Sequence, residues 1–251
     1  MVAVPETIDL EVRRQDSPTS SPYWERYSIP YLPRQNVISV LMILARDPKT
    51  REGKKTSPVV YDRACLEEVC GSCAMRINGA SRMACSALID SLDQPIRLEP
   101  LGKFPVLRDL AVDRGVMFDA LKRVRAWVPI DGTYDLGPGP RMAEAERQQA
   151  YEYSKCITCG NCLDVCPQVN GRSNFIGAAA IAQARLFNSH PTGRMNAAER
   201  LEALMADGGL DDCGNAQNCV RVCPKSIPLT TAIAEMYRAT TLHGLKKLFG
   251  T

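Results

Sequence analysis

The stretch that decides the fold runs from residue 156 to residue 167 and reads Cys156-Ile-Thr-Cys159-Gly-Asn-Cys162-Leu-Asp-Val-Cys166-Pro167. Its spacing, C-x2-C-x2-C-x3-C-P, is typical of iron–sulfur ligation, in which three cysteines hold one cluster and the fourth reaches a second cluster. Four cysteines at this spacing before a proline are not expected by chance. The stretch therefore predicts two clusters in the C-terminal half of the chain.

A second copy of this run contains one substitution. It reads Cys213-Gly-Asn-Ala216-Gln-Asn-Cys219-Val-Arg-Val-Cys223-Pro224, so alanine stands where the second cysteine would be. In such a repeat, the last cysteine of each run joins the cluster of the other run. Alanine cannot bind iron, so we expect a 3Fe–4S cluster at the second run; a 4Fe–4S cluster with an open corner is the alternative. The predicted ligands are Cys156, Cys159, Cys162 and Cys223 for a 4Fe–4S cluster, and Cys166, Cys213 and Cys219 for the 3Fe–4S cluster.

The other four cysteines lie earlier in the chain, at Cys65, Cys70, Cys73 and Cys85. The spacing C-x4-C-x2-C with a distant fourth cysteine is the plant-type ferredoxin pattern for a 2Fe–2S cluster. A zinc site with four thiolates is the alternative, although zinc ribbons usually pair two short C-x-x-C knuckles. The three predicted clusters together use all eleven cysteines.

Composition excludes several other classes of protein. The chain has 251 residues, a formal net charge of +3 and 6% aromatic residues, which gives no reason to expect nucleic acid as a partner. Its longest apolar run, Val37–Ala45, is too short to span a bilayer, and no secretory signal is visible. No nucleotide-binding fingerprint occurs, so a flavin would have to sit on another chain.

Patterning predicts an α+β chain with a β-rich half before an α-rich half. The order of elements fits an N-terminal β-grasp (plant-type ferredoxin) domain, 1–125, a Pro/Gly-rich linker, 126–141, and an all-α bacterial-ferredoxin-like domain, 142–251. Asn36 is a candidate helix cap, and Asn78-Gly79 is a hairpin signal. The expected strands are 8–12, 24–29, 59–61, 75–77, 81–83 and 96–99, and the expected helices are 37–46, 107–124, 142–153, 178–187, 197–206 and 228–240, with an amphipathic tail over 241–249.

In this order, the three cysteine groups resemble those of the iron–sulfur subunit of succinate dehydrogenase and fumarate reductase (respiratory complex II). The resemblance covers essentially the whole chain and extends to Arg63-Ala-Cys65, Cys70-Gly-Ser-Cys73-Ala-Met75 and Cys223-Pro224-Lys225. It implies an electron-transfer subunit of succinate dehydrogenase, without substrate chemistry of its own. Electrons would come from an FAD-containing flavoprotein subunit and pass through the 2Fe–2S, 4Fe–4S and 3Fe–4S clusters to quinone or haem in a membrane anchor. The resemblance also implies a peripheral position on the cytoplasmic side of the inner (plasma) membrane.

Two positions bear on the subtype. Ubiquinone-reducing members carry tryptophan after the Cys-Pro beside the 3Fe–4S cluster and tend to have histidine after the equivalent of Cys213. Here Gln168 follows Pro167, and Gly214 follows Cys213. The chain is therefore more similar to menaquinone-linked bacterial members, whose anchor holds haem. An adapter of fumarate reductase, or of another flavin-dependent oxidoreductase, is the alternative function.

Overall fold

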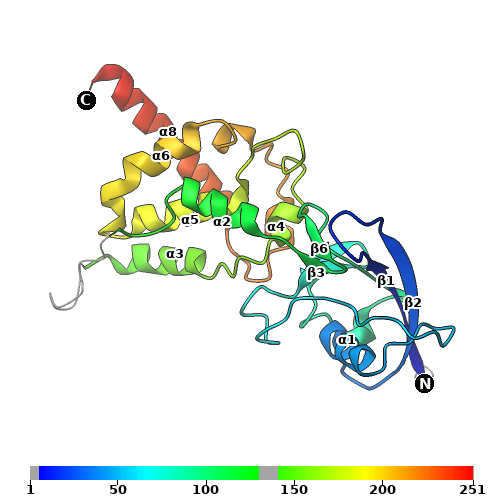
Figure 1. Cartoon of the computed structure of the whole chain (residues 1–251). Helices are drawn as coiled ribbons and strands as arrows, with labels where there is room; N and C mark the ends of the chain where they lie inside the picture. Colours follow the sequence, from blue (N-terminus) through cyan, green and yellow to red (C-terminus); the bar gives the residue numbers. More distant parts are fainter. Residues whose placement is uncertain (1–5, 130–140, 251) are drawn as a thin grey trace. The chain divides into compact units, whose positions relative to one another are not determined.

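The computed structural model describes residues 6–129 and 141–250, which form two compact units (Figure 1). The sheet unit comprises Met1–Arg114 together with Ile157–Asp164, and the helical unit comprises Gly115–Cys156 together with Val165–Thr251. A mixed sheet in one unit and helices in the other confirm the predicted combination of a β-rich and an α-rich part. The predicted linker, 126–141, falls mostly outside the described residues.

The two units do not follow the predicted boundaries residue for residue. The helix after Arg114 contacts a helix of the helical unit, and the short helix at Asn161–Asp164 contacts a strand of the sheet unit. Composition shifts along the chain mark changes of secondary structure, but they do not report which elements pack together. As limits of independently folding domains, 1–125 and 142–251 stay predictions.

A five-stranded sheet forms the centre of the sheet unit, in the order β2-β1-β5-β3-β4. Strand β1 pairs antiparallel with β2 and parallel with β5, while β3 pairs antiparallel with both β4 and β5. Alternate residues Ile8, Leu10 and Val12 are buried, as their period of two predicts. The strands are β1 (Thr7–Arg14), β2 (Tyr23–Pro30), β3 (Ala74–Ile77), β4 (Ala80–Met83) and β5 (Ile96–Glu99).

Local sequence signals explain two further elements of the sheet unit. The Asn36 side chain caps α1 (Val37–Arg46) by accepting a hydrogen bond from the Ser39 backbone amide (2.8 Å). In return, the Asn36 backbone amide donates to the Ser39 hydroxyl (3.0 Å). Asn78 and Gly79 both adopt positive φ, which is the turn geometry that joins β3 to β4. The cap and the hairpin are therefore as predicted.

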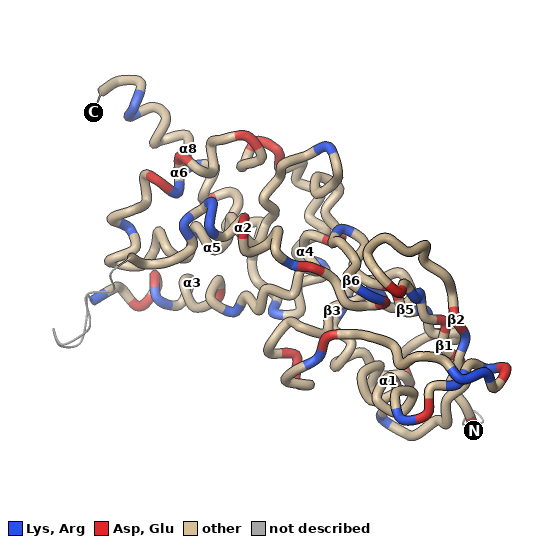
Figure 2. The backbone as a smooth tube through the Cα atoms, viewed as in Figure 1, with Lys and Arg blue, Asp and Glu red and all other residues tan. Residues whose placement is uncertain are grey.

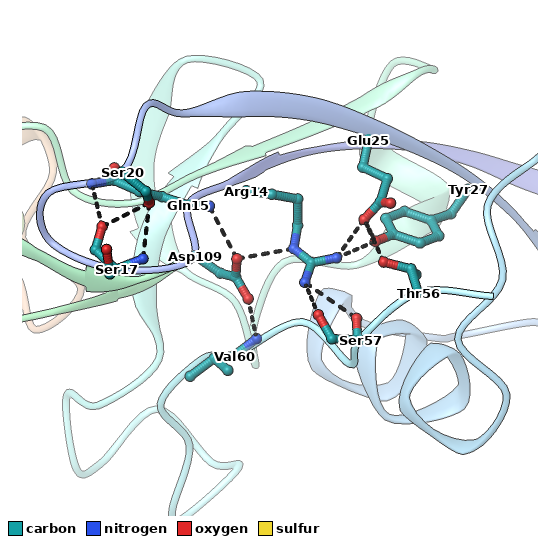
Figure 3. Close-up of polar contacts among 10 residues, drawn as sticks. All are labelled: Arg14, Gln15, Ser17, Ser20, Glu25, Tyr27, Thr56, Ser57, Val60 and Asp109. Carbon is teal, nitrogen blue, oxygen red and sulfur yellow. Dashed lines mark hydrogen bonds and ion pairs between the residues drawn. The ribbon is translucent and has the colours of Figure 1, made fainter. Parts of the chain in front are cut away.

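A buried arginine connects β1 to three other segments of the sheet unit (Figure 3). The Arg14 side chain is fully buried and donates to the Asp109 carboxylate (2.9 Å), the Tyr27 hydroxyl (2.6 Å), the Glu25 carboxylate and both oxygens of Ser57. Burial alone would lower the pKa of Arg14, but its hydrogen bond to Asp109 and the nearby acidic groups raise that pKa above its ordinary value. The guanidinium thus stays charged in the core.

Asp109 explains why part of the helix predicted at 107–124 is wrong. Its carboxylate accepts hydrogen bonds from Arg14 and from the amides of Gln15 (3.1 Å) and Val60 (2.8 Å), and its φ of 47° turns the chain. Residues 106–112 therefore form a two-stranded ribbon, β6 (Val106–Arg108) with β7 (Ala111–Val112), and the helix α2 covers only Gly115–Arg123. The strand predicted at 59–61 is also wrong. The Val60 amide donates to the Asp109 carboxylate and the Val60 carbonyl oxygen accepts from the Leu110 amide, instead of pairing within a strand.

The helical unit is built around α5 (Gly177–Ser189), which contacts α2, α3, α6 and α8. Ala178, Ala180 and Ala184 are buried on α5, and such small side chains let neighbouring helices approach closely. No helix in the described part of the chain is long and apolar enough to cross a membrane. The other helices are α3 (Glu144–Ser154), α4 (Asn161–Asp164, in the sheet unit), α6 (Ala197–Met205), α7 (Asn218–Arg221) and α8 (Leu229–Phe249), with short 3-10 turns at Ile89–Ser91, Gly193–Asn196 and Leu210–Asp212.

Candidate iron–sulfur cluster sites

The first cysteine group lies in a loop of the sheet unit whose backbone amides point at sulfur. The amides of Glu67, Val69 and Cys70 donate to Cys65 Sγ at 3.4, 3.3 and 3.3 Å. The amide of Glu68 donates to Cys85 Sγ at 3.3 Å, so the loop reaches the cysteine that is distant in sequence. Convergent N–H groups stabilise negative charge on thiolate sulfur. This donor set fits an iron–sulfur cluster.

Local backbone conformation explains how so many amides reach the sulfur atoms. Leu66, Glu68 and Gly71 all adopt positive φ, at 63°, 56° and 77°. The left-handed conformation is unfavourable for leucine and glutamate, and such residues concentrate at functional sites where the surroundings enforce them. The alternation of conformations turns successive N–H groups to the same side, as in anion-binding nests.

The thiols of this group differ in their electrostatic surroundings. The hydrogen bond between Cys70 Sγ and Ser72 Oγ (3.3 Å), assisted by backbone amides, lowers the pKa of Cys70 to about 6. Burial, with Cys73 alongside, raises the pKa of Cys85 to about 12. Cys85 interacts electrostatically with both Cys73 and Cys65, so the fold places these three residues near one another; their ligation of one cluster stays a prediction.

A second group lies wholly in the helical unit. Cys166, Cys213 and Cys219 line one small, partly open cavity, and Ala216 lines the same cavity. Burial raises the pKa of Cys219, and the neighbouring thiols of Cys166 and Cys213 raise it further. The structure thus brings the three cysteines of the predicted 3Fe–4S site into one cavity that the alanine also lines. The residues that line the cavity also include four with amide side chains, Gln168, Asn215, Gln217 and Asn218.

The backbone preserves the internal repeat where the cysteine is lost. In the first run, Thr158 and Gly160 have φ values of 52° and 88°; in the second run, the equivalent residues Asn215 and Gln217 have φ values of 51° and 58°. Ala216 lies between the last two, as Cys159 lies between the first two. The loop therefore keeps the conformation of a cluster-binding run although one side chain cannot bind iron.

The remaining four cysteines are divided between the two units. Cys159 and Cys162 belong to the sheet unit, and Cys156 and Cys223 belong to the helical unit. Their assignment to one cluster rests on the sequence motif. No three His, Cys, Asp or Glu side chains within residues 6–129 and 141–250 converge where one metal ion would bind. In a cluster where each thiolate binds a different iron, such convergence is not required.

The position of Ile157–Asp164 in the sheet unit is a feature that sequence reasoning missed. Asp164, whose side chain is fully buried, accepts hydrogen bonds from Arg76 Nε (2.8 Å), the Ser81 hydroxyl and the Lys103 amide (3.1 Å). Asp164 lies between the last two cysteines of the run, and this acidic residue is the sequence signal that could have indicated packing of the segment in the sheet unit. In the second run the equivalent residue is Arg221, which is exposed.

Comparisons with known protein families agree with a 2Fe–2S site earlier in the chain and with a two-cluster domain later in the chain. Residues 9–119 match the "2Fe-2S iron-sulfur cluster binding domain" family, and residues 152–227 match the "4Fe-4S dicluster domain" family. The first range contains the four cysteines of the ferredoxin-like loop, and the second contains the other seven.

Relatives of known name extend over nearly the whole chain. The chain is 61% identical over 246 residues to the succinate dehydrogenase iron-sulfur subunit of Bacillus subtilis (98% of this chain, 97% of the relative). It is 31% identical to the fumarate reductase iron-sulfur subunit of Wolinella succinogenes (88% of this chain, 91% of the relative). A chain of the Mycobacterium smegmatis Sdh1 complex in the apo form shares the fold, with a TM-score of 0.79 at 24% identity over 94% of this chain and 96% of that one.

Proposed function

Since this chain belongs to the family of iron–sulfur subunits of succinate dehydrogenase and fumarate reductase, we propose that it relays electrons from a succinate-oxidising flavoprotein to a membrane anchor. When bound, iron–sulfur clusters of different type accept and release single electrons at different potentials. The chain's own residues bind the clusters, orient donors towards their sulfur atoms and set their environment. Substrate chemistry then belongs to a different chain of the enzyme.

The ligand sets of the proposal follow the cysteine groups. Cys65, Cys70, Cys73 and Cys85 hold a 2Fe–2S cluster; Cys156, Cys159, Cys162 and Cys223 hold a 4Fe–4S cluster; Cys166, Cys213 and Cys219 hold a 3Fe–4S cluster. The single observation that carries the proposal is the cavity that these last three cysteines line together with Ala216. A run that keeps its cluster-binding conformation with only three thiolates supports a trinuclear cluster. The sheet around the 2Fe–2S loop is, in this proposal, a β-grasp fold.

Succinate oxidation is the direction that the comparisons favour. Identity is 61% to a relative named for succinate dehydrogenase and 31% to one named for fumarate reductase. The partners in this proposal are an FAD-containing flavoprotein subunit and a haem- and quinone-binding anchor. Gly214 and Gln168 line the cavity of the proposed 3Fe–4S site and support the menaquinone-linked subtype rather than a ubiquinone-reducing one.

The end of α8 supports a peripheral position at the cytoplasmic face of the membrane. Leu242, Leu245, Leu248 and Phe249 are 49, 46, 76 and 72% exposed. Two lysines occupy the last turn, and Figure 2 shows basic residues near this end of the helix. Exposed apolar side chains beside lysines are typical of helices that contact an anionic lipid surface or a membrane protein.

Two measurements on one preparation test the function. The complex is purified from membranes in mild detergent, its chains are identified, and iron, zinc and acid-labile sulfide are determined. We expect a flavoprotein and a membrane anchor to co-purify, with about nine non-haem irons and ten inorganic sulfides per chain, as the three cluster types require. Isolation without partners, or zinc in the cysteine sites, would contradict the proposal.

A further inference from the structure

The loop that carries the first cysteine group makes a close backbone contact at Gly71. A β-carbon built on Gly71 would overlap the carbonyl oxygen of Ile157 and would lie 3.1 Å from the amide nitrogen of Cys159. Both contacted atoms belong to the sheet unit, as Gly71 does. Glycine at this position therefore lets the loop of the proposed 2Fe–2S site touch the run that carries Cys159, a proposed ligand of the 4Fe–4S cluster.

The loop side of this contact is held by an arginine. Arg114 donates to the carbonyl oxygen of Gly71 (2.6 Å) and to that of Ser72. Its side chain fixes the peptide groups on either side of Ser72 while their amides remain available to sulfur. A shift of the Gly71 and Ser72 backbone away from Arg114 would break these charge-assisted hydrogen bonds.

The opposite side of the contact is held just as firmly. Asp164 fastens the run to β3 and β4 through Arg76 and Ser81. Gly160, whose φ is +88°, lies against Phe104, whose ring a β-carbon there would approach to 2.9 Å. Both partners of the Gly71 contact are thus fixed within one packed unit, and neither can move freely to make room for a side chain.

We propose that Gly71 is a positioning residue for electron transfer, because it sets the close approach between the 2Fe–2S loop and the Cys159 run. This inference rests on the proposed function and deepens it. A methyl group at Gly71 must move neighbouring backbone by about 1 Å to reach even a 3.0 Å contact. Electronic and magnetic coupling between two redox centres weakens as their separation grows. The substitution Gly71→Ala therefore weakens the coupling between the two clusters without removing a ligand of either.

The chain offers a matched control for backbone strain. Gly79 has φ +79°, close to the +77° of Gly71, but a β-carbon at Gly79 would meet nothing within 4 Å. Alanine at either position carries the same left-handed backbone strain. Only alanine at Gly71 also displaces the neighbouring run. The difference between the two variants therefore isolates the close contact.

The test uses the whole membrane complex with its clusters reduced stepwise. Electron paramagnetic resonance measures the microwave power that half-saturates the 2Fe–2S signal, before and after the 4Fe–4S cluster is reduced. In the wild type, the second reduction raises this power, because a nearby paramagnetic centre relaxes the first. We expect Gly71→Ala to contain all three clusters and to lose part of this increase, while Gly79→Ala matches the wild type. An unchanged increase in Gly71→Ala would overturn the inference about Gly71.

A second variant keeps the inference testable if Gly71→Ala fails to assemble. Asp164→Asn retains the size of the side chain but weakens its pairing with Arg76, so the Cys159 run is held less firmly against the loop. We expect this variant also to lose part of the relaxation effect; wild-type relaxation in it would overturn the inference. Absence of either cluster signal from the wild-type complex would instead contradict the proposed function.

Discussion

Replacing Arg14 by methionine tests whether the buried ion network holds β1 in the sheet unit. The side chains of Arg14 and Asp109 are both fully buried, and their 2.9 Å ion pair has no solvent to replace a missing partner. The substitution would leave the Asp109 carboxylate in the core with only the Gln15 and Val60 amides as donors. Removing one partner of a buried pair destabilises a protein by about 3–5 kcal/mol. We expect a loss in this range.

Arg13→Met is the matched control on the neighbouring position of β1. The Arg13 side chain is 41% exposed and pairs with Glu99 at 3.7 Å. Its removal should therefore lower the free energy of unfolding by at most about 1 kcal/mol. Native-state hydrogen exchange of the β1 amides is the appropriate assay, because global unfolding would release the clusters and be irreversible. In Arg14→Met the opening free energy of these amides falls by about 3–5 kcal/mol.

A double variant separates an unpaired charge from simple loss of packing. An asparagine in place of Asp109 would carry no charge and would keep one acceptor oxygen, which can serve only one of the Gln15 and Val60 amides. We expect Arg14→Met with Asp109→Asn to be less destabilised than Arg14→Met alone, since an uncompensated buried charge is the larger penalty. Equal exchange in Arg14→Met and Arg13→Met would refute this reasoning.

Four further predictions concern the cluster loops and the sheet. A Cys70 thiolate that binds iron has no S–H to donate, so the Ser72 hydroxyl, 3.3 Å away, is then the donor; Ser72→Ala removes this hydrogen bond, and the midpoint potential of the 2Fe–2S cluster becomes more negative in a redox titration. Asn36→Ala removes the cap of α1 and is expected to destabilise that helix by about 0.5–2 kcal/mol, measured by amide exchange, whereas Asn36→Ser retains most of the cap. The hydrogen bond from Arg97 keeps the pKa of Glu11 below its ordinary 4.5. The Glu11 carboxylate therefore stabilises the fold above pH 4.5, and this contribution disappears as the pH falls through the lowered pKa. The difference in free energy of unfolding between wild type and Glu11→Gln should accordingly vanish at low pH. Ala216→Cys supplies the missing thiolate, so the trinuclear resonance signal should disappear while the iron content rises by about one atom per chain.

A structural feature of this chain can be predicted from the sequence when the residues that determine it lie close together along the chain. The alternation of Ile8, Leu10 and Val12, the cap at Asn36 and the Asn78-Gly79 turn act locally, and each was visible in the sequence. The cysteine runs were visible for the same reason, since their spacing is itself the motif.

The features that sequence reasoning missed depend on partners far along the chain. Asp109 turns the chain out of a helical pattern because it pairs with Arg14, which lies 95 residues earlier. Asp164 brings its run onto the sheet through Arg76, at a separation of 88 residues. In both cases a buried carboxylate needs a distant donor, and local patterning carries no information about where that donor lies.

The proposed 3Fe–4S cluster lies at the cavity where three cysteines are found with Ala216, a residue that cannot bind iron. The direct measurement is electron paramagnetic resonance of the air-oxidised complex at low temperature, with the signal integrated against protein concentration. We predict a near-isotropic signal from an oxidised trinuclear iron cluster, at about one spin per chain. A complex with its full iron and sulfide content but without this signal would contradict the assignment of Cys166, Cys213 and Cys219 to a 3Fe–4S cluster.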